Sequence, residues 1–254
     1  MSRFRRTAAE PGAAPDVAPD ARSRVTVRLD DVHVRLGERD VLRGIDLDLA
    51  EHRVGVVGAN GSGKSTLARL LNGLVVPSRG HVVVDGLDTR TNGAAVRRLV
   101  GFVFTDPDAQ IVMPTVAEDV AYSLRPRRGE RGPTEAERAV VVHAALAERG
   151  LAGHAEHPAH LLSGGQKQLL AITSVLVTRP RLLVADEPTT LLDLRNARAV
   201  GRLLGSLEQQ VVVVTHDLDL LDGYDRVLVV DDGAVVADDE PRPALAFYRR
   251  LMDA

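Results

Sequence analysis

The stretch from Gly58 to Ser65, GANGSGKS in one-letter code, decides how this chain folds. It follows the apolar run RVGVV (53–57) and fits the pattern G-x-x-x-x-G-K-[ST] at the start of a predicted helix. Glycines let backbone N–H groups surround a phosphate, and the start of a helix adds a favourable dipole. Lys64 is expected to reach the β- and γ-phosphates, and the Ser65 hydroxyl to bind Mg²⁺. The predicted nucleotide-binding residues are Gly58, Ala59, Asn60, Gly61, Ser62, Gly63, Lys64, Ser65 and Thr66.

Two carboxylates end another apolar run, LLVADEP (182–188). Parallel sheets carry ligand chemistry at the ends of their strands. We therefore expect Asp186 to hold Mg²⁺, directly or through water, and Glu187 to orient and polarise the water that attacks the γ-phosphate. Pro188 stops the strand.

The remaining pattern predicts an α/β fold. Continuous apolar runs at 53–58, 182–186 and 211–216 are typical of parallel strands buried on both faces. The segments 25–36 and 45–49 alternate as half-exposed antiparallel strands do, and 226–238 predicts a hairpin with Asp-Gly at its turn. Helices are expected over 64–72, 134–150, 165–177 and 195–209, and a strand over 100–104.

Composition excludes several classes of protein. The 254 residues are 44% hydrophobic and 26% charged, which is ordinary for a globular protein. A formal charge of −3 gives no case for nucleic acid as a partner, and the lack of cysteine removes disulfides and thiolate chemistry. No apolar run is long enough for a membrane span. Residues 1–24 are rich in Ala, Pro and Asp without an apolar core, so we expect a disordered tail and a cytoplasmic chain.

The motif LSGGQ (162–166) is the most discriminating one in the chain. Ser163, Gly164 and Gly165 form a second phosphate-sized turn that opens a helix, followed by Gln166. A chain with one phosphate loop needs this second element only if two copies face each other. Each copy then supplies the motif to the nucleotide of the other.

These motifs, with TLLD (190–193) and VVTHD (213–217), resemble those of ATP-binding cassette ATPases in order and spacing from Val25 to about Asp238. The resemblance implies a P-loop NTPase core with a mainly parallel sheet, an antiparallel β subdomain and an inserted helical subdomain at about 114–164, all within 25–254. It also implies a head-to-tail dimer, preferably of identical chains, holding two ATP molecules. Asp193 then belongs to the D-loop at the dimer interface, and His216 contacts the γ-phosphate and holds Glu187 and the water.

A further resemblance points to one group of transporters. VFTDPDAQIVMPTVAEDVAYSL (103–124) is similar to the Q-loop region of energy-coupling factor (ECF) transporter ATPases. There, two ATPases drive a transmembrane T component, and an S component captures the substrate. The segments 61–89 and 186–196 look most like the biotin-transporter ATPase, with cobalt or nickel importers as the alternative. The resemblance implies a peripheral protein on the cytoplasmic face of the membrane.

Two positions depart from the family pattern. Thr105 stands where the Q-loop glutamine is expected, and Gln110, five residues on, is expected in the docking surface for the membrane partner. Leu36 stands where the family has an adenine-stacking aromatic residue, so we expect weaker or less base-selective nucleotide binding.

Three alternatives stay open at this stage. A cassette ATPase acting on nucleic acid is disfavoured because the chain has neither a long coiled-coil insertion nor a second cassette. A regulatory module that holds ATP without hydrolysis is disfavoured by Glu187 and His216. His154, His157 and His160 are expected to be solvated surface residues, with a metal site as the lesser alternative because Pro158 disrupts the helix they would share.

Overall fold

The computed structural model describes residues 24–126 and 131–253, so the predicted disordered tail lies outside the described residues except for Arg24. The larger of its two sheets has the strand order β10-β9-β3-β8-β7-β6. All neighbouring strands in it are parallel except the β9–β10 pair, which is antiparallel. The strands are β3 (Arg53–Val57), β6 (Val100–Val103), β7 (Leu182–Asp186), β8 (Gln210–Val214), β9 (Arg226–Asp231) and β10 (Ala234–Asp239).

The smaller sheet is antiparallel and has the order β2-β1-β4-β5. Its strands are β1 (Val27–Leu36), β2 (Arg39–Leu49), β4 (Arg79–Val84) and β5 (Leu87–Asp88). β1 and β2 confirm the alternating pattern, because their buried side chains recur at every second position along much of each strand.

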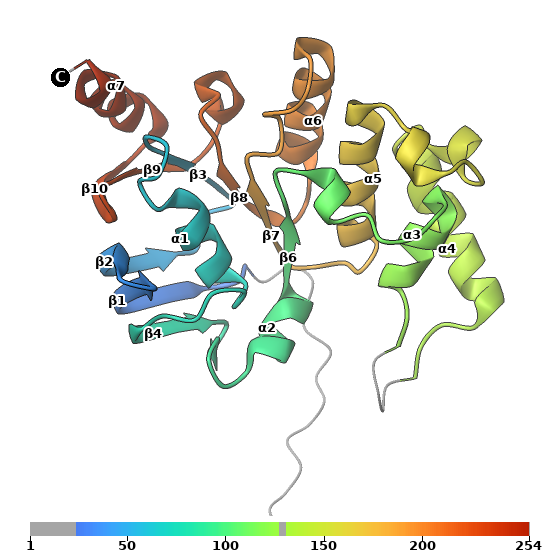
Figure 1. Cartoon of the computed structure of the whole chain (residues 1–254), viewed down its shortest axis with the longest axis horizontal. Helices are drawn as coiled ribbons and strands as arrows, with labels where there is room; N and C mark the ends of the chain where they lie inside the picture. Colours follow the sequence, from blue (N-terminus) through green and yellow to red (C-terminus); the bar gives the residue numbers. More distant parts are fainter. Residues whose placement is uncertain (1–23, 127–130, 254) are drawn as a thin grey trace, which may run out of the picture.

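Six of the seven helices of the described residues lie between strands along the chain, and α7 follows the last strand (Figure 1). They are α1 (Lys64–Leu71), α2 (Gly93–Leu99), α3 (Val116–Ser123), α4 (Glu135–Glu148), α5 (Gly164–Leu176), α6 (Leu194–Ser206) and α7 (Pro241–Met252). Single 3₁₀ turns form at η1 (Pro107–Ala109), η2 (Ala152–His154), η3 (Ala159–Leu161) and η4 (Leu218–Leu221). Within the described residues, none of these helices has the length and apolar character needed to cross a membrane.

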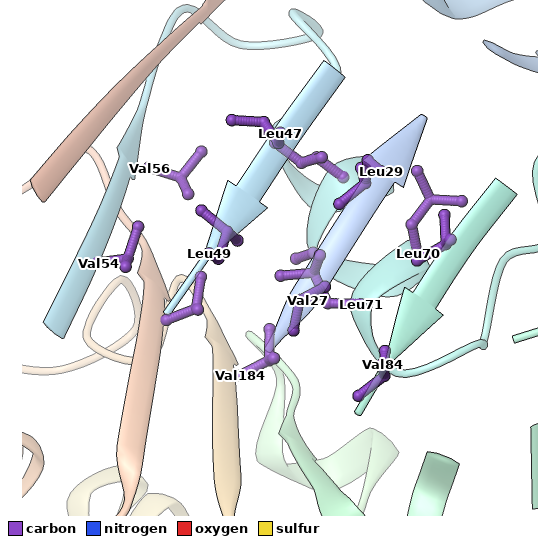
Figure 2. Packing of buried hydrophobic residues seen from close by; sticks show 14 of the residues in the cluster. Val27, Leu29, Leu47, Leu49, Val54, Val56, Leu70, Leu71, Val84 and Val184 are labelled. Atoms are coloured by element: carbon purple, nitrogen blue, oxygen red, sulfur yellow. The ribbon is translucent and has the colours of Figure 1, made fainter. Parts of the chain in front are cut away.

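The central strands bury both faces, as their continuous apolar sequences predict. All five residues of β3, β7 and β8 are buried. Leu182 and Val184 of β7 face the cluster shared with α1 and the smaller sheet, whereas Leu183 and Ala185 face α5, α6 and α7. Figure 2 shows the first cluster, where side chains from β1, β2, β3, β4, β7 and α1 meet between the two sheets.

A third group of buried residues lies between α3, α4 and α5, at the end of the molecule opposite α7 (Figure 1). Val116 and Val120 of α3 pack there against Val142 and Leu146 of α4, and Leu170 of α5 joins them. This cluster forms in the stretch between β6 and β7, where the sequence predicts helices.

Some predicted boundaries are wrong, and some elements are not predicted by the pattern. The helix expected to reach Gln209 ends at Ser206, because Leu207 is extended and Gln210 already pairs with Leu182 of β7. α7 is hidden in the sequence by Pro241 and Pro243, although proline is compatible with the first turn of a helix. α2 and β4 are too short to give a clear periodic signal.

Candidate active site

The loop between β3 and α1 closes tightly against the rest of the sheet. A Cβ on Gly58 would lie 2.0 Å from the Val230 carbonyl oxygen of β9, so only glycine fits there. Gly63, the residue before α1, has φ 108°, in the region that favours glycine. The turn of the β9–β10 hairpin supports the loop, since the Gly233 N–H donates to the Ser62 carbonyl oxygen at 3.0 Å. The loop is therefore held by long-range contacts as well as by its own sequence.

Lys64 lies inside this loop. Its ammonium group donates to the carbonyl oxygens of Gly58 at 2.7 Å and Ala59 at 2.8 Å, and the residue is only 6% exposed. Burial lowers the pKa of the Lys64 ammonium, while the charges of Glu187 and Asp186 act in the opposite direction. A lysine ammonium in a glycine-rich loop at the start of a helix is a site for anionic oxygens.

The two predicted metal residues, Ser65 and Asp186, come together with Thr105, which stands in place of the Q-loop glutamine. The Ser65 hydroxyl of α1 donates to Asp186 Oδ1 at 2.8 Å, and the Thr105 hydroxyl, just after β6, donates to the Asp186 carbonyl oxygen at 2.8 Å. Asp186 is 1% exposed, and Arg69 NH2 lies 3.7 Å from its Oδ2. Burial raises the pKa of the Asp186 carboxyl, against the hydrogen bond from Ser65. A buried carboxylate beside a hydroxyl is a donor set of hard oxygens that fits Mg²⁺.

Glu187 directly follows the last residue of β7, and two neighbouring side chains hold its carboxylate. Its Oε2 accepts from the Thr190 hydroxyl at 2.9 Å and lies 2.7 Å from His216 Nδ1. Because a carboxylate only accepts, Nδ1 carries the proton in this pair. No hydrogen bond from the described residues reaches Oε1, so this oxygen is available to a water molecule. Glu187 has φ 53°, an unusual conformation for a residue with a side chain and one that recurs at functional sites.

Two adjoining cavities meet at Asn60 and Glu187. The first, of about 290 Å³, is lined by Arg39, Val41, Asn60, Gly61, Gly63, Lys64, Ser65, Thr66 and Glu187. The second, of about 500 Å³, is lined by Gly58, Ala59, Asn60, Glu187, Thr190, His216, Tyr248 and Met252. Of the predicted loop residues only Ser62 lines neither cavity, because it is 5% exposed and turned inward.

The residues of LSGGQ lie elsewhere, at the start of α5. Ser163 Oγ accepts from the Gln166 N–H at 3.3 Å, and Gln166 Oε1 accepts from the Ser163 N–H at 2.9 Å, which is a capping box. Asp193 caps α6 through the Asn196 N–H at 2.9 Å, and the Asn196 side chain packs against Gly165. Neither Asp193 nor the LSGGQ residues line the two cavities.

The side chain of Gln110 is used within the protein. Its Oε1 accepts from the Phe104 N–H at 3.1 Å, and its Nε2 donates to the Ala171 carbonyl oxygen of α5 at 3.2 Å. The amide of this half-buried side chain ties the loop after β6 to α5, and a place for Gln110 in a docking surface stays a prediction. Leu36, which stands where the family has an adenine-stacking aromatic residue, is 54% exposed and lines neither cavity. Arg39 and Val41 of β2 line the first one.

The comparison with known proteins agrees with this geometry. A model of the ABC transporter family matches residues 42–190, which include the phosphate loop, LSGGQ, Asp186 and Glu187. The chain belongs to the ABC transporter family. It is an ATP-binding ATPase with the fold of that family, as the resemblance implied.

Relatives of this ABC ATPase carry transporter names. An ABC transporter ATP-binding protein of Deinococcus radiodurans is 54% identical over 215 residues, 85% of this chain and 93% of the relative. The biotin transport ATP-binding protein BioM of Rhizobium etli is 41% identical over 227 residues, 89% of this chain and 99% of the relative. The energy-coupling factor transporter ATP-binding protein EcfA1 of Symbiobacterium thermophilum is 45% identical over 221 residues, 84% of this chain and 75% of the relative.

Solved structures give the same result. The chain is similar to cbiO1 from Clostridium perfringens, part of the ABC transporter complex cbiONQ, with a TM-score of 0.76 and 29% identity over 91% of this chain and 94% of that one. It is also similar to the ATP-binding cassette MJ0796, a dimer in a post-hydrolysis state bound to ADP and Pi. That TM-score is 0.75, with 31% identity over 85% of this chain and 99% of that one.

Several residues of this ABC ATPase site are not predicted from its motifs. Arg39 comes from β2, Thr190 follows Glu187, and Tyr248 and Met252 come from α7. Tyr248 and Met252 are four residues apart on one helix, a spacing that places them on the same face, but α7 itself is not evident in the sequence. Thr190 opens the motif TLLD and stands three residues after Glu187, but the sequence does not show that its hydroxyl bonds to that carboxylate.

Proposed function

We propose that this ABC ATPase is the energy-coupling subunit of an ECF-type importer and that its cargo is biotin. The names of the relatives support the transporter type, since one is a biotin transport protein and another an energy-coupling factor protein. In this proposal the chain works with a transmembrane T component and a substrate-binding S component. It binds them as a peripheral protein at the cytoplasmic face of the membrane, without nucleic acid as a partner.

The single observation that carries the catalytic assignment is the arrangement around Lys64. Ser65 bonds to Asp186 at 2.8 Å, and Glu187 lies 2.7 Å from His216. Lys64, Ser65 and Glu187 line one cavity, and Glu187 and His216 line the adjoining one. We assign Lys64 and the N–H groups of the phosphate loop to the β- and γ-phosphates of ATP. Ser65 and Asp186 would hold Mg²⁺, which when bound neutralises charge on the phosphate oxygens.

Hydrolysis then follows from the position of Glu187. In this proposal Oε1 of Glu187 accepts a hydrogen bond from the water that attacks the γ-phosphorus and takes its proton as the new P–O bond forms. The bond from the γ-phosphorus to the bridging oxygen breaks, giving ADP and phosphate. His216 holds the other carboxylate oxygen, so that Glu187 keeps one orientation toward the water. Thr105, bonded to the backbone of Asp186, positions the end of β7.

Two copies of the chain are needed for a complete site in this proposal. Ser163, Gly164, Gly165 and Gln166 line neither nucleotide cavity of their own chain, so we assign them to the ATP of the partner. Asp193 is assigned to the same interface, and the exposed side chains of Leu191 and Leu194, 63% and 66% exposed, flank it. The similarity to a dimeric ATP-binding cassette supports this arrangement, with two identical chains as the preferred form.

We further propose that residues 25–254 form one ATPase unit with a helical subdomain at about 114–164. The separate cluster of buried residues between α3, α4 and α5 supports the subdomain, because a unit that moves as one body needs a core of its own.

The catalytic assignment is tested with Glu187→Gln. We expect ATPase turnover to fall at least 100-fold, the effect of removing a general base, while ATP holds the variant as a dimer on size exclusion. Glu208→Gln, an exposed glutamate at the end of the α6–β8 connection, is the matched control and should keep wild-type turnover. Full turnover in Glu187→Gln would show that another residue acts on the water.

The transport assignment is tested by detergent extraction of the tagged chain with its membrane partners. We expect a small hydrophobic T component and an S component that binds biotin. An S component that binds cobalt or nickel would redirect the cargo to metal ions while keeping the ECF type. Recovery of ribosomes or DNA in place of membrane proteins would contradict the transport function.

A further inference from the structure

His154 lies directly against the LSGGQ motif. Its Nε2 is 2.9 Å from Nε2 of Gln166, in a partly buried contact. The orientation of the Gln166 amide is fixed by its other bond, because Oε1 accepts from the Ser163 N–H at 2.9 Å. The amide NH₂ therefore faces the imidazole and donates to it. His154 must then be neutral, with Nε2 as acceptor and its proton on Nδ1.

The imidazole ring is itself held in place. His157 lies against it in a T-shaped contact, with ring centroids 5.0 Å apart at an interplanar angle of 80°. The His154 N–H donates to the Leu151 carbonyl oxygen at 2.9 Å, and Leu151 is fully buried. The ring therefore presents Nε2 to Gln166 from an ordered segment.

A histidine at position 154 costs folding free energy, and its packing contacts do not explain why a polar ring stands there. Its Nδ1 is buried and has no hydrogen-bond partner among the described residues. A buried donor without a partner destabilises a fold, and an apolar side chain would avoid that loss. The contact that does use the polarity of the ring is the one with Gln166. A metal role is not supported, since no cluster of three His, Asp or Glu side chains within 24–126 and 131–253 has a metal-binding arrangement.

We propose that His154 is a positioning residue for the LSGGQ motif. Through Gln166 it keeps the capping box closed and so fixes the Ser163 hydroxyl and the first N–H groups of α5. If the Gln166 amide were free to rotate, the Ser163 N–H would lose its acceptor, and only the 3.3 Å bond from the Gln166 N–H to Ser163 Oγ would still hold Ser163 in the turn. The inference rests on the proposed function, because Ser163 meets a nucleotide only in the head-to-tail dimer. His154 therefore serves the ATP bound by the partner.

The test compares His154→Leu with His154→Gln, whose amide oxygen can accept the same hydrogen bond from Gln166. We expect the turnover number of His154→Leu to fall about 2- to 10-fold, the effect of one lost hydrogen bond, and His154→Gln to recover most of it. His143→Leu, an exposed histidine on α4, is the matched control and should match the wild type. ATP binding to the monomer should be unchanged in every variant, since the phosphate loop is not altered.

A second measurement uses the ATP-bound dimer of Glu187→Gln. That dimer holds two LSGGQ contacts, so adding His154→Leu should raise its dissociation constant by about the square of the single-site effect, roughly 4- to 100-fold. Equal behaviour of the Leu and Gln variants, whether both wild-type or both impaired, would overturn the positioning role. Failure of Glu187→Gln alone to form a dimer would instead contradict the proposed function, and the turnover series would still decide the role of His154.

Discussion

Asp119 of α3 is the buried acid on which the loop after β6 depends. The residue is 4% exposed. Its Oδ1 accepts from the N–H groups of Val112 at 2.9 Å and Met113 at 3.1 Å, and its Oδ2 accepts from the Ser174 hydroxyl of α5 at 2.8 Å. One carboxylate thus joins the loop, α3 and α5, so its removal should weaken the packing of all three against one another.

Asp119→Ala leaves two backbone N–H groups without an acceptor. A buried donor that loses its partner costs about 1–3 kcal/mol, which gives about 2–6 kcal/mol for two. The side chain of Val112 is exposed, so its N–H can turn to water, and we expect a loss of about 2–4 kcal/mol in the free energy of unfolding. Asp119→Asn keeps an acceptor for both N–H groups and should lose about 1–2 kcal/mol.

Urea denaturation measures this loss, and a double-mutant cycle with Ser174→Ala tests its cause. Because both substitutions break the same hydrogen bond, the double variant should be more stable than the sum of the single effects predicts, by about 0.5–2 kcal/mol. Asp108→Ala, which removes a surface pair with Lys167, is the control and should cost at most about 1 kcal/mol. Strict additivity, or a loss in Asp119→Ala no larger than in the control, would refute the reasoning.

Three further predictions concern Gly165 of LSGGQ, Tyr248 in the cavity beside Glu187, and Asp186 at the end of β7. Gly165→Ala would place its Cβ 2.5 Å from Cγ of Asn196, so unfolding in urea should show a loss of about 1–3 kcal/mol, most of it recovered by Asn196→Ala in the same chain. Burial, and then the charge of Glu187, raise the pKa of Tyr248. Glu187→Gln should therefore lower the pKa of Tyr248. This pKa is measured by an absorbance titration, with the Tyr248 signal identified as the part that is lost in Tyr248→Phe. An unchanged pKa would show that the charge of Glu187 does not act on Tyr248 of α7. Because burial raises the pKa of Asp186, its ionised form destabilises the fold above that pKa, so Asp186→Asn should raise the melting temperature at neutral pH without nucleotide while abolishing Mg²⁺-dependent turnover. The gain should shrink as the pH falls and the wild-type carboxyl takes up its proton, and a gain independent of pH would point to another cause.

Features written in one continuous stretch of sequence are predictable here. The phosphate loop is recognisable from its own glycines, Lys64 and the helix that follows, and the structure has α1 starting at Lys64. The same holds for the parallel strands with continuous apolar runs and for the hairpin turn at Asp232 and Gly233, both with positive φ. In each case the chemistry and the backbone geometry that supports it lie within a few residues.

Features that join distant segments are only partly predictable. In the stretch from Gly101 to Val120, η1 forms at Pro107–Ala109, with the Asp106 side chain accepting from the Asp108 N–H. The side chain of Gln110 bonds to the carbonyl oxygen of Ala171, 61 residues further along the chain, and the motif resemblance gives no sign of this contact. Sequence spacing carries no information about such a pairing, because it depends on how α5 packs beside β6.

The sequence by itself determined the family and the ATPase activity, and it predicted Lys64, Ser65, Asp186, Glu187 and His216 as site residues, because each stands within a motif whose local backbone follows from its own residues. Only the tertiary structure decided that Thr105 would bond to the backbone of Asp186, that α7 would bring Tyr248 beside Glu187, and that His154 would hold Gln166. The physical reason is that strand order and helix packing bring together segments that are distant in the chain. Contacts between them follow from burying three shared clusters of apolar side chains, and no single segment encodes them.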